Sequence, residues 1–254
     1  MSGPGFRDHF SAAAAGYAAF RPTYPAALFE FVTALAPARS LAWDAGTGSG
    51  QAACALAERF NRVIATDPSR AQIAHAVSHP RVRYVLARAE DGFAEDGACD
   101  LVTAAQALHW FDIPAFFAAA RRALKPGGAI AVWGYAGAVL DDPACDAVFQ
   151  AYAREAAPYW PPERAIIDDG YRGVAFPFDE VAAPRMELVM HPGLAEFTGY
   201  LRTWSASLRY REAVGHDPVD ELEGRLREVW PAGARVRLTW PLHLRAGRSA
   251  AVAP

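Results

Sequence analysis

The fold of this chain is decided by Leu41-Ala42-Trp43-Asp44-Ala45-Gly46-Thr47-Gly48-Ser49-Gly50. An apolar run passes through an acid, Asp44, into a turn built on three alternating glycines. Apolar residues then recur with the spacing of an amphipathic helix, at Ala53, Leu56, Ala57 and Phe60. The stretch therefore predicts strand, tight turn and helix, the first half of a βαβ unit. Glycines suit a turn whose backbone must approach a ligand without a Cβ in the way.

Asp67 is the second marker of a ligand site. It ends an apolar run that begins at Arg62, and Pro68 follows it. It lies ~20 residues beyond the glycines, where dinucleotide-type folds place a carboxylate that accepts hydrogen bonds from a ribose diol. Taken alone, the glycines would fit an ordinary strand-to-helix turn, and Asp67 would fit a helix N-cap before Pro68. Together they favour an adenosine-type ligand.

Further β-α repeats follow this unit. The pattern predicts strands over residues 82–87, 99–106 and 129–135, and helices over residues 25–35, 69–77, 143–156, 194–208 and from Asp217-Pro218 onward. The helix before residue 129 is expected to stop at Pro126-Gly127-Gly128. Alternating runs at residues 186–190 and 236–244 add late, antiparallel strands. The expected fold class is α/β, a doubly wound Rossmann-like sheet of seven mostly parallel strands with an antiparallel C-terminal strand.

The chain is expected to form a single domain, residues 1–254, with four parts. Residues 1–36 would be an N-terminal helical cover, residues 37–136 the cofactor-binding core, residues 137–184 a lid-like insertion, and residues 185–254 the C-terminal helices and strands. The insertion is rich in proline and aromatic residues. That composition suits a cover over a substrate and equally suits surface decoration.

Composition narrows the class of function. The 254 residues are 52% hydrophobic and 21% charged with a formal net charge of −3, so nothing draws the chain generally to nucleic acid or an anionic membrane. No run reaches the ~20 apolar residues of a membrane helix. Cys54, Cys99 and Cys145 are scattered and lack the spacing of a disulfide framework or a zinc site, so we expect no metal. We expect a cytoplasmic protein.

Polar and aromatic side chains gather after the strand predicted over residues 99–106. Gln106, His109 and Trp110 lie there, and ligands of open parallel sheets bind at the carboxyl ends of strands. A lone histidine is more often structural than catalytic, so its position, and not its type, favours a ligand-facing role. Tyr17 and Arg21 belong to an aromatic N-terminal stretch that could pack as a cover or lie over a ligand.

The glycine run resembles the cofactor motif of class I S-adenosylmethionine-dependent methyltransferases. The same family pattern is matched by Asp67, the pair Ala89-Glu90, the stretch His109-Trp110-Phe111 and Leu124-Lys125-Pro126-Gly127-Gly128. Residues 17–25 and 203–207 further resemble the trans-aconitate-methyltransferase-like branch of small-molecule methyltransferases. The resemblance spans the whole chain and is strongest over residues 40–135.

The resemblance implies a role for each matching residue toward S-adenosyl-L-methionine and its product S-adenosyl-L-homocysteine. The glycines would approach the methionine part and the ribose, Asp44 would orient the loop and the amino group, and Asp67 would bind the ribose hydroxyls. The adenine would be bordered by Ala89 and Glu90. The implied cofactor-binding residues are Tyr17, Arg21, Asp44, Gly46, Gly48, Gly50, Asp67, Ala89, Glu90 and Gln106.

Two positions depart from the family pattern. Arg88 stands where an acid often precedes the alanine of the adenine loop, which puts that adenine contact in doubt. Pro241 lies in a strand that the family sets inside the sheet, where proline has no N–H for the ladder. We therefore expect a bend or bulge at Pro241.

The expected function is methyl transfer from S-adenosyl-L-methionine to a small-molecule acceptor, such as a carboxylate or hydroxyl, held near His109 and Trp110. Displacement at a sulfonium methyl chiefly needs alignment and exclusion of water. A carboxylate acceptor needs no general base. For an alcohol or amine, His109 is the best-placed candidate base.

Alternatives stay open at this level. A nicotinamide-dependent oxidoreductase would use G-x-G-x-x-G, whereas the glycines here run G-x-G-x-G. An adenosylmethionine-binding protein without transfer activity would share the same cofactor residues. Nucleic-acid methylation is weaker, because the C-terminal arginines are interleaved with acids. The expected partner is thus a small-molecule acceptor, with no nucleic acid and no membrane, and the protein itself is a monomer or homodimer.

Overall fold

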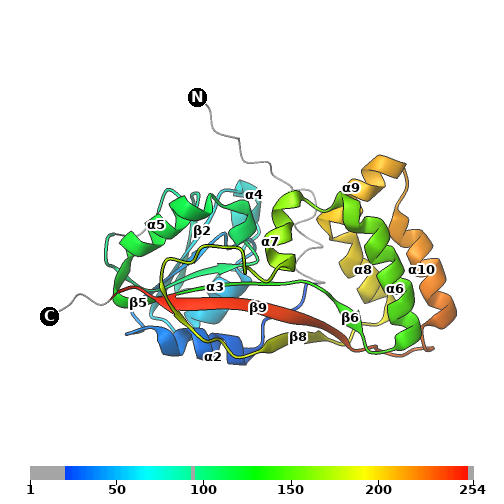
Figure 1. Ribbon diagram of the computed structural model, residues 1–254, viewed down its shortest axis with the longest axis horizontal. Coiled ribbons are helices and arrows are strands. Elements are labelled where there is room, and N and C mark those ends of the chain that lie inside the picture. The colour runs from blue at the N-terminus through cyan, green and yellow to red at the C-terminus, as the bar shows by residue number, and fades with distance from the viewer. Residues whose placement is uncertain (1–20, 93–94, 251–254) are drawn as a thin grey trace.

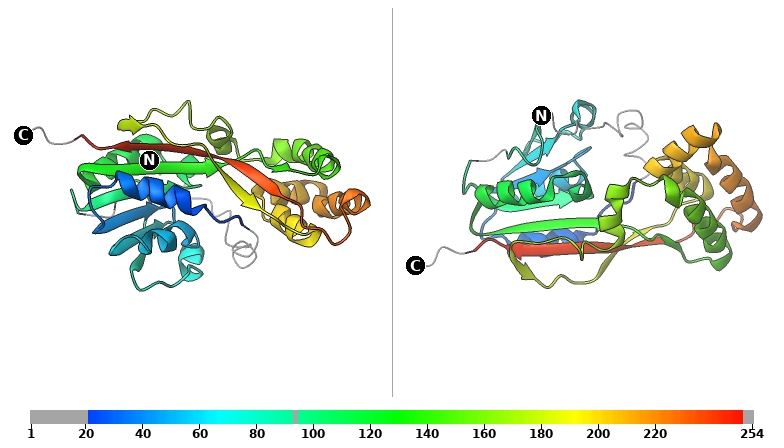
Figure 2. Two further views of the ribbon diagram at one scale, coloured as in Figure 1. Left: turned by 90° about the horizontal axis from the view of Figure 1, so that it is seen from below. Right: turned by 45° about the horizontal axis from the view of Figure 1, so that its top comes forward.

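The structure is a computed structural model that describes residues 21–92 and 95–250, and every structural statement below concerns these residues (Figure 1). Its centre is a twisted sheet with helices on both faces (Figure 1, Figure 2). The first strands run parallel in the spatial order β3-β2-β1-β4-β5. They are β1 (Leu41–Ala45), β2 (Arg62–Asp67), β3 (Val82–Leu86), β4 (Cys99–Ala105) and β5 (Leu124–Tyr135).

The long strand β9 (Leu238–Arg248) lies antiparallel beside β5 and carries the remaining strands. These are β6 (Val139–Leu140), β7 (Asp179–Val181) and β8 (Met186–Met190), all antiparallel to β9. The series β3-β2-β1-β4-β5-β9-β8 gives the expected seven strands, and β6 and β7 are short additions. The α/β class with an antiparallel C-terminal strand is therefore confirmed.

Alternate residues of the strands face opposite helical layers. On one face, Ala42 and Leu101 pack in a core shared with α2 and α3. On the other face, Trp43 and Val102 pack in a core shared with α5. Neighbouring residues of a strand point to opposite faces, so Ala42 and Trp43 serve different layers. The helices of this half are α2 (Ala26–Leu35), α3 (Gln51–Ala57), α4 (Arg70–Ala74) and α5 (Ile113–Ala123).

The second half of the chain builds a helical group beside the sheet, and β9 runs from the sheet to it (Figure 1). Its members are α6 (Pro143–Ala156), α8 (Leu194–Arg202), α9 (Ser205–Val214) and α10 (Pro218–Val229). The apolar core continues from α2 and α3 into this group, where it includes Phe149, Phe197 and Trp204. Further short helices within the described residues are η2 (Leu108–Trp110), η3 (Ala157–Tyr159), η4 (Pro162–Arg164) and α7 (Ala165–Asp168).

Two helices differ from the sequence-based prediction. The helix expected over residues 69–77 ends at Ala74, because the backbone of Val77 bonds elsewhere. The N–H of Val77 donates to the Ser49 carbonyl at 3.0 Å, and its carbonyl accepts from the Tyr84 hydroxyl at 2.7 Å. The pattern over residues 194–208 is divided into α8 and α9, because Trp204 is extended with φ −68° and ψ 135°.

Two proline positions also differ from expectation. Pro126-Gly127-Gly128 is not the stop of α5: the helix ends at Ala123, and the tripeptide lies inside β5. Pro241 causes no bulge, since β9 keeps a continuous register with β8. On its other side, β9 pairs with β5 as far as Leu242 and with β6 from Thr239. Pro241 lies between these two pairings. A missing N–H is therefore tolerated in an interval between two partner strands.

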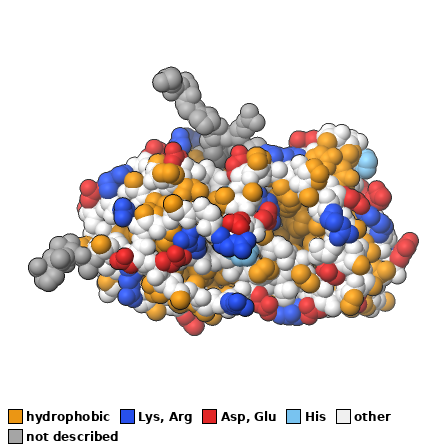
Figure 3. All heavy atoms as spheres, in the orientation of Figure 1, with side chains coloured by type: hydrophobic (Ala, Val, Ile, Leu, Met, Phe, Trp, Pro, Cys, Tyr) orange, Lys and Arg blue, Asp and Glu red, His pale blue; other side chains and the backbone are white. Residues whose placement is uncertain are grey.

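The surface carries mixed charge. On the face shown in Figure 3, basic and acidic side chains are interspersed. Several C-terminal arginines pair with carboxylates: Arg202 with Asp217, Asp220 and Glu223, Arg225 with Glu155, Arg235 with Glu196, and Arg237 with Asp141 and Glu187. None of the helices formed by the described residues is long and apolar enough to cross a membrane.

Residues 171–181, here called the strap, are fastened to β9 by Arg245. The guanidinium donates to both carboxylate oxygens of Glu180, at 2.7 and 2.8 Å, and to the carbonyls of Tyr171 and Val174, at 3.1 and 2.5 Å. It also lies over the Phe176 ring, 4.7 Å from its centroid. One arginine thus holds the second half of the 137–184 insertion against the sheet.

The Arg245→Ala variant should lower the free energy of unfolding by about 2–3 kcal/mol. The reason is that the hydrogen bonds of the half-buried Arg245 side chain to Glu180, Tyr171 and Val174 are all lost at once. Urea denaturation measures the change. Arg237→Ala is the matched control just before the same strand, since the ion pairs of Arg237 are exposed and contribute little. Equal losses in the two variants would contradict the role assigned to Arg245.

Candidate functional site

The glycine turn joins β1 to α3 in a conformation that side chains rarely adopt. Gly46, Gly48 and Gly50 have φ of +67°, +56° and +86°. A Cβ on Gly46 would lie 2.6 Å from the Ala107 Cβ, and one on Gly50 would collide with the Tyr84 hydroxyl. All three glycines are therefore required by the backbone conformation, and Gly46 and Gly50 are also required by their close neighbours Ala107 and Tyr84. The packing of Ala107 and Tyr84 against the turn was not predicted from the sequence.

Asp44 holds the turn from inside the sheet. Its side chain is fully buried and accepts hydrogen bonds from the hydroxyls of Thr47 and Thr103, both at 2.7 Å. Burial raises the pKa of Asp44 to about 6, the two hydroxyl bonds oppose that shift, and the charge of Asp67 adds to it. The bond to Thr47 ties the centre of the glycine turn to β1.

Asp67 connects the glycine turn to the next helix. Its carboxylate accepts from the N–H of Gly48 at 2.9 Å and from the N–H of Ser69 at 2.8 Å. The N-cap of α4 is Ser69, whose hydroxyl accepts from the Gln72 N–H. The alternative of Asp67 as the helix cap is therefore wrong. A carboxylate accepts about four hydrogen bonds, so these two bonds are compatible with binding a ribose diol as well.

The Ala89-Glu90 pair is attached to the start of α5. Ala89 is buried in the core shared with that helix, and Glu90 accepts from the backbone N–H of Asp112 at 2.8 Å. Arg88 pairs with Glu90 at 3.2 Å, so the residue that departs from the family pattern supports its neighbour. These residues follow β3, beside the turn and Asp67, at the carboxyl ends of the parallel strands.

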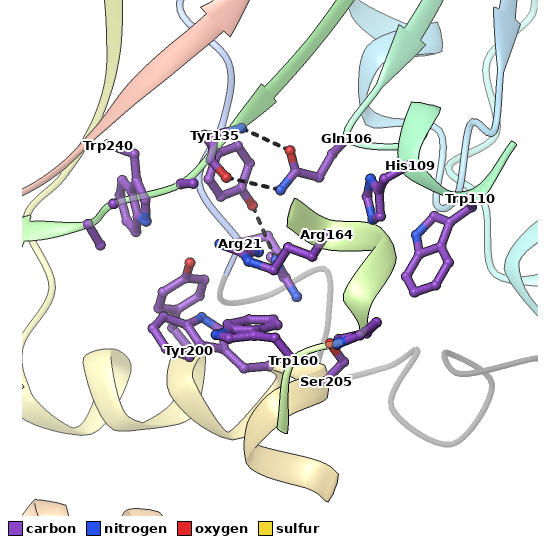
Figure 4. A pocket seen from close by; sticks show the side chains of 15 residues that line it. Arg21, Gln106, His109, Trp110, Tyr135, Trp160, Arg164, Tyr200, Ser205 and Trp240 are labelled. Carbon is purple, nitrogen blue, oxygen red and sulfur yellow. Dashed lines mark hydrogen bonds between the residues drawn. The ribbon is translucent and has the colours of Figure 1, made fainter. Parts of the chain in front are cut away.

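A second group of predicted residues lines a cavity of about 80 Å³, here called the aromatic cavity (Figure 4). The lining includes Arg21, Gln106, His109, Trp110, Tyr135, Trp160, Arg164, Tyr200, Trp204, Ser205 and Trp240. The structure therefore brings Arg21, Gln106, His109 and Trp110 together, apart from the group of Asp44, the glycines, Asp67, Ala89 and Glu90. Tyr17 lies outside the described residues.

Two arginines give the aromatic cavity a positive charge. Arg164 stacks on the Trp160 ring at 3.9 Å and pairs with Asp168 at 3.5 Å, and its buried Nε has no hydrogen-bond partner among the described residues. Burial lowers the pKa of Arg164, yet a guanidinium keeps its charge at neutral pH. Arg21 donates to the Tyr135 hydroxyl at 3.3 Å. Among the described residues that line the cavity there is no Asp or Glu.

His109 faces these arginines as a neutral imidazole. Burial and, to a smaller extent, the charge of Arg164 lower its pKa to about 3. Its Nδ1 is buried and has no hydrogen-bond partner within the described part of the chain. The ring lies 4.6 Å from that of Trp110. At neutral pH the imidazole can donate or accept a hydrogen bond but is a weak base.

Sequence reasoning missed several residues of the aromatic cavity. Arg164 was passed over, and Tyr135, Tyr200 and Trp204 fell within expected elements without being named as site residues. The run from Trp160 to Arg164, an arginine within aromatic and proline residues, is the one local signal that could have pointed here.

Comparison with known proteins agrees with this arrangement. A family described as a methyltransferase domain matches residues 43–132. A provisionally assigned methyltransferase of Dictyostelium discoideum is 32% identical over 229 residues, which cover 89% of this chain and 87% of that protein. The chain belongs to the class I S-adenosylmethionine-dependent methyltransferases. This membership speaks against the nicotinamide-dependent alternative.

Solved structures of other methyltransferases share the fold. A provisionally assigned type II methyltransferase from Anaeromyxobacter dehalogenans is 45% identical with a TM-score of 0.84, over 91% of this chain and 99% of that one. A phosphoethanolamine N-methyltransferase of Haemonchus contortus, in complex with S-adenosylhomocysteine, has a TM-score of 0.50 at 17% identity over 95% of this chain and 58% of that one. The second likeness concerns the fold alone.

The residues of this methyltransferase fit its cofactor. The backbone of the glycine turn is bare at the carboxyl end of β1, and the Asp67 carboxylate stands at the end of β2 beside it. A backbone without side chains and an adjacent carboxylate suit a nucleoside with a free ribose diol.

The pKa of Asp44 predicts an unusual pH dependence of stability for the methyltransferase. It is about 6 in the folded protein against 3.8 for an ordinary aspartate, so the folded state binds more protons between these values. The free energy of unfolding should therefore fall as pH rises from about 4 to about 6, by up to about 3 kcal/mol from this group. Asp44→Asn should lack this fall in urea denaturation between pH 4 and pH 8.

Asp100 provides a control of opposite sign. Burial alone would raise its pKa, but bonds from Lys125 and from the N–H groups of Leu41 and Ser40 outweigh burial and lower it. Its stabilising contribution is present above the unfolded pKa and is lost as pH falls. Asp100→Asn should therefore lose stability at pH 7. A loss of similar size in Asp44→Asn at pH 7 would contradict the assignment.

Proposed function

We propose that this methyltransferase transfers the methyl group of S-adenosyl-L-methionine to a small anionic acceptor, a carboxylate, bound in the aromatic cavity. The observation that carries the proposal is Arg164, whose buried Nε–H has no partner among the described residues in a cavity without acids. A buried unsatisfied donor costs roughly 1–3 kcal/mol, and an anionic ligand would relieve that cost. A guanidinium also matches the geometry of a carboxylate.

The cofactor half of the proposal assigns roles by position. When bound, S-adenosyl-L-methionine supplies a methyl group activated by the sulfonium. Gly46, Gly48 and Gly50 allow close approach, and Asp67 accepts from the ribose hydroxyls. Asp44 orients the turn through Thr47, at 2.7 Å. The resemblance also implies that Ala89 and Glu90 border the adenine and that Tyr17 belongs to the methionine end. Its methionine-end roles for Gln106 and Arg21 are not part of this proposal, because the Gln106 amide bonds Tyr135 at both ends and Arg21 bonds Tyr135 and Thr203.

The state of His109 favours a carboxylate over an alcohol or amine. A general base works best when its pKa is near the working pH, and the pKa of His109 is about 3. A carboxylate acceptor is already deprotonated and needs no base. We therefore assign His109 and Trp110 to contact with the acceptor, with Nδ1 of His109 forming a hydrogen bond that orients it.

The walls of the aromatic cavity suit displacement chemistry. Trp160, Trp204, Trp240 and Tyr200 surround the arginines with apolar surface. Apolar walls exclude water and hold a planar acceptor in line with the methyl group, which is what this reaction chiefly needs.

Calorimetry with S-adenosyl-L-homocysteine tests the cofactor half. The unmodified protein should bind it, and Asp67→Asn should weaken binding by about 1.5–3 kcal/mol, the usual loss for bonds to a charged group. Asp169→Asn is the matched control, because that carboxylate is partly exposed and pairs with Arg172. Unchanged affinity in Asp67→Asn would contradict the role of Asp67, and binding of NAD in place of S-adenosyl-L-homocysteine would end the proposal.

Methyl transfer to a panel of small molecules tests the acceptor half. We expect transfer from labelled S-adenosyl-L-methionine to one or more of trans-aconitate, itaconate and benzoate, and none to benzyl alcohol or benzylamine. Arg164→Gln should lower kcat/KM roughly 30- to 150-fold, as expected for a lost bond between charged groups. Arg172→Gln, an exposed arginine of the same insertion, should leave it unchanged. Transfer confined to the neutral alcohol or the amine would refute an anionic acceptor.

A further inference from the structure

Gln106 has a strained backbone and a fully engaged side chain. Its φ is +53°, and among the described non-glycine residues only Tyr171 shares a positive φ. Such a conformation persists where the surroundings enforce it and is often found at functional sites. The side-chain Oε1 accepts from the N–H of Tyr135 at 2.9 Å, and Nε2 donates to the Tyr135 carbonyl at 3.2 Å.

These bonds extend the sheet by one rung beyond its last backbone pair. The pairing of β4 with β5 ends at Ala105 and Trp133, and the N–H of Gln106 donates to the Trp133 carbonyl at 2.7 Å. The side-chain amide then takes the place of the next peptide group (Figure 4). Gly134 makes room for it, because a Cβ there would lie 2.7 Å from Oε1 of Gln106.

Tyr135 connects Gln106 to the opposite wall of the aromatic cavity. Its hydroxyl accepts from Arg21 at 3.3 Å, and the same guanidinium donates to the Thr203 carbonyl at 3.3 Å. Thr203 lies at the break between α8 and α9, and Arg21 also lies over the Tyr200 ring at 5.6 Å. A continuous set of contacts therefore runs from the end of β4 to the helical group.

We propose that Gln106 is a positioning residue, which fixes Tyr135 and through it the Arg21 guanidinium that faces the acceptor. The proposal rests on the proposed function for the occupant of the aromatic cavity. Both ends of the Gln106 amide are committed to Tyr135. Loss of the amide should therefore disturb anion binding much more than cofactor binding.

The test combines three variants and two probes. Gln106→Met keeps the length of the side chain and removes both bonds, whereas Tyr135→Phe keeps those bonds and removes the contact with Arg21. The double variant tests whether Gln106 and Tyr135 affect benzoate binding through the same set of contacts. Tyr152→Phe is the matched control, because its buried hydroxyl bonds Ser207 at 2.6 Å within the helical group. The probes are benzoate and S-adenosyl-L-homocysteine, with hydrogen exchange on each protein.

Both single variants should weaken benzoate binding about tenfold, the scale of a lost hydrogen-bonded contact. The dissociation constant of S-adenosyl-L-homocysteine should change by less than about threefold, and the double variant should bind benzoate no more weakly than the single ones. Hydrogen exchange should rise over residues 133–137 and 200–206 in Gln106→Met, and over residues 200–206 alone in Tyr135→Phe. Tyr152→Phe should alter neither affinity.

Other results would overturn the proposal. If Gln106→Met weakened the binding of benzoate and of S-adenosyl-L-homocysteine equally, Gln106 would be a cofactor ligand or a general structural residue. If the losses of benzoate affinity in the two single variants multiplied in the double variant, Gln106 would not act through Tyr135. Unchanged exchange over residues 200–206 in Gln106→Met would do the same. The exchange pattern decides the role of Gln106 even if the unmodified protein does not bind benzoate, and the panel of acceptors tests the anionic acceptor separately.

Discussion

The cofactor half of the molecule depends on the turn from β1 into α3. Its glycines hold positive φ, and Ala107 and Tyr84 approach it so closely that side chains have no room. Asp44 keeps this turn in place through Thr47 and Thr103, and burial raises the pKa of its carboxyl to about 6. The Asp44 carboxylate is therefore ionised at neutral pH although its ionisation lowers the free energy of unfolding. Its hydrogen bonds to Thr47 and Thr103 are needed for the shape of the turn.

The aromatic cavity depends on a different constraint, namely cations held partly out of water. Arg164 is fixed by the Trp160 ring and by Asp168, and it lies in a setting where electrostatic interactions are stronger than at an exposed surface. Burial, and then the charge of Arg164, keep His109 neutral. The arrangement supports the proposed anionic acceptor, since an anion would satisfy the Nε–H of Arg164 while a cation would meet like charge.

Features whose residues lie close together in the chain could be predicted from the sequence, and features assembled from distant segments could not. The parallel strands and the residues proposed to bind the cofactor follow local rules, because the glycine spacing and the acid that ends β2 are visible in one stretch. The aromatic cavity joins Arg21, Gln106, Arg164 and Tyr200 from four segments, and only tertiary packing brings them together. Trp204 falls in the stretch predicted as a helix over residues 194–208 and is 7% exposed in the core, yet it also lines the cavity. Periodicity cannot separate these two roles.

The wall of the aromatic cavity combines residues of the sheet with residues of the insertion. Its sheet part includes Tyr135, which is held by Gln106 directly after β4 and packs its ring 5.9 Å from that of Trp240 on β9. Arg164 belongs to the 137–184 insertion, whose strap Arg245 fastens to β9. Changes within the insertion can therefore alter the charge and shape presented to an acceptor while the glycine turn, Asp44 and Asp67 stay as they are. A fold built in this way keeps one methyl donor and can be adapted to different acceptors.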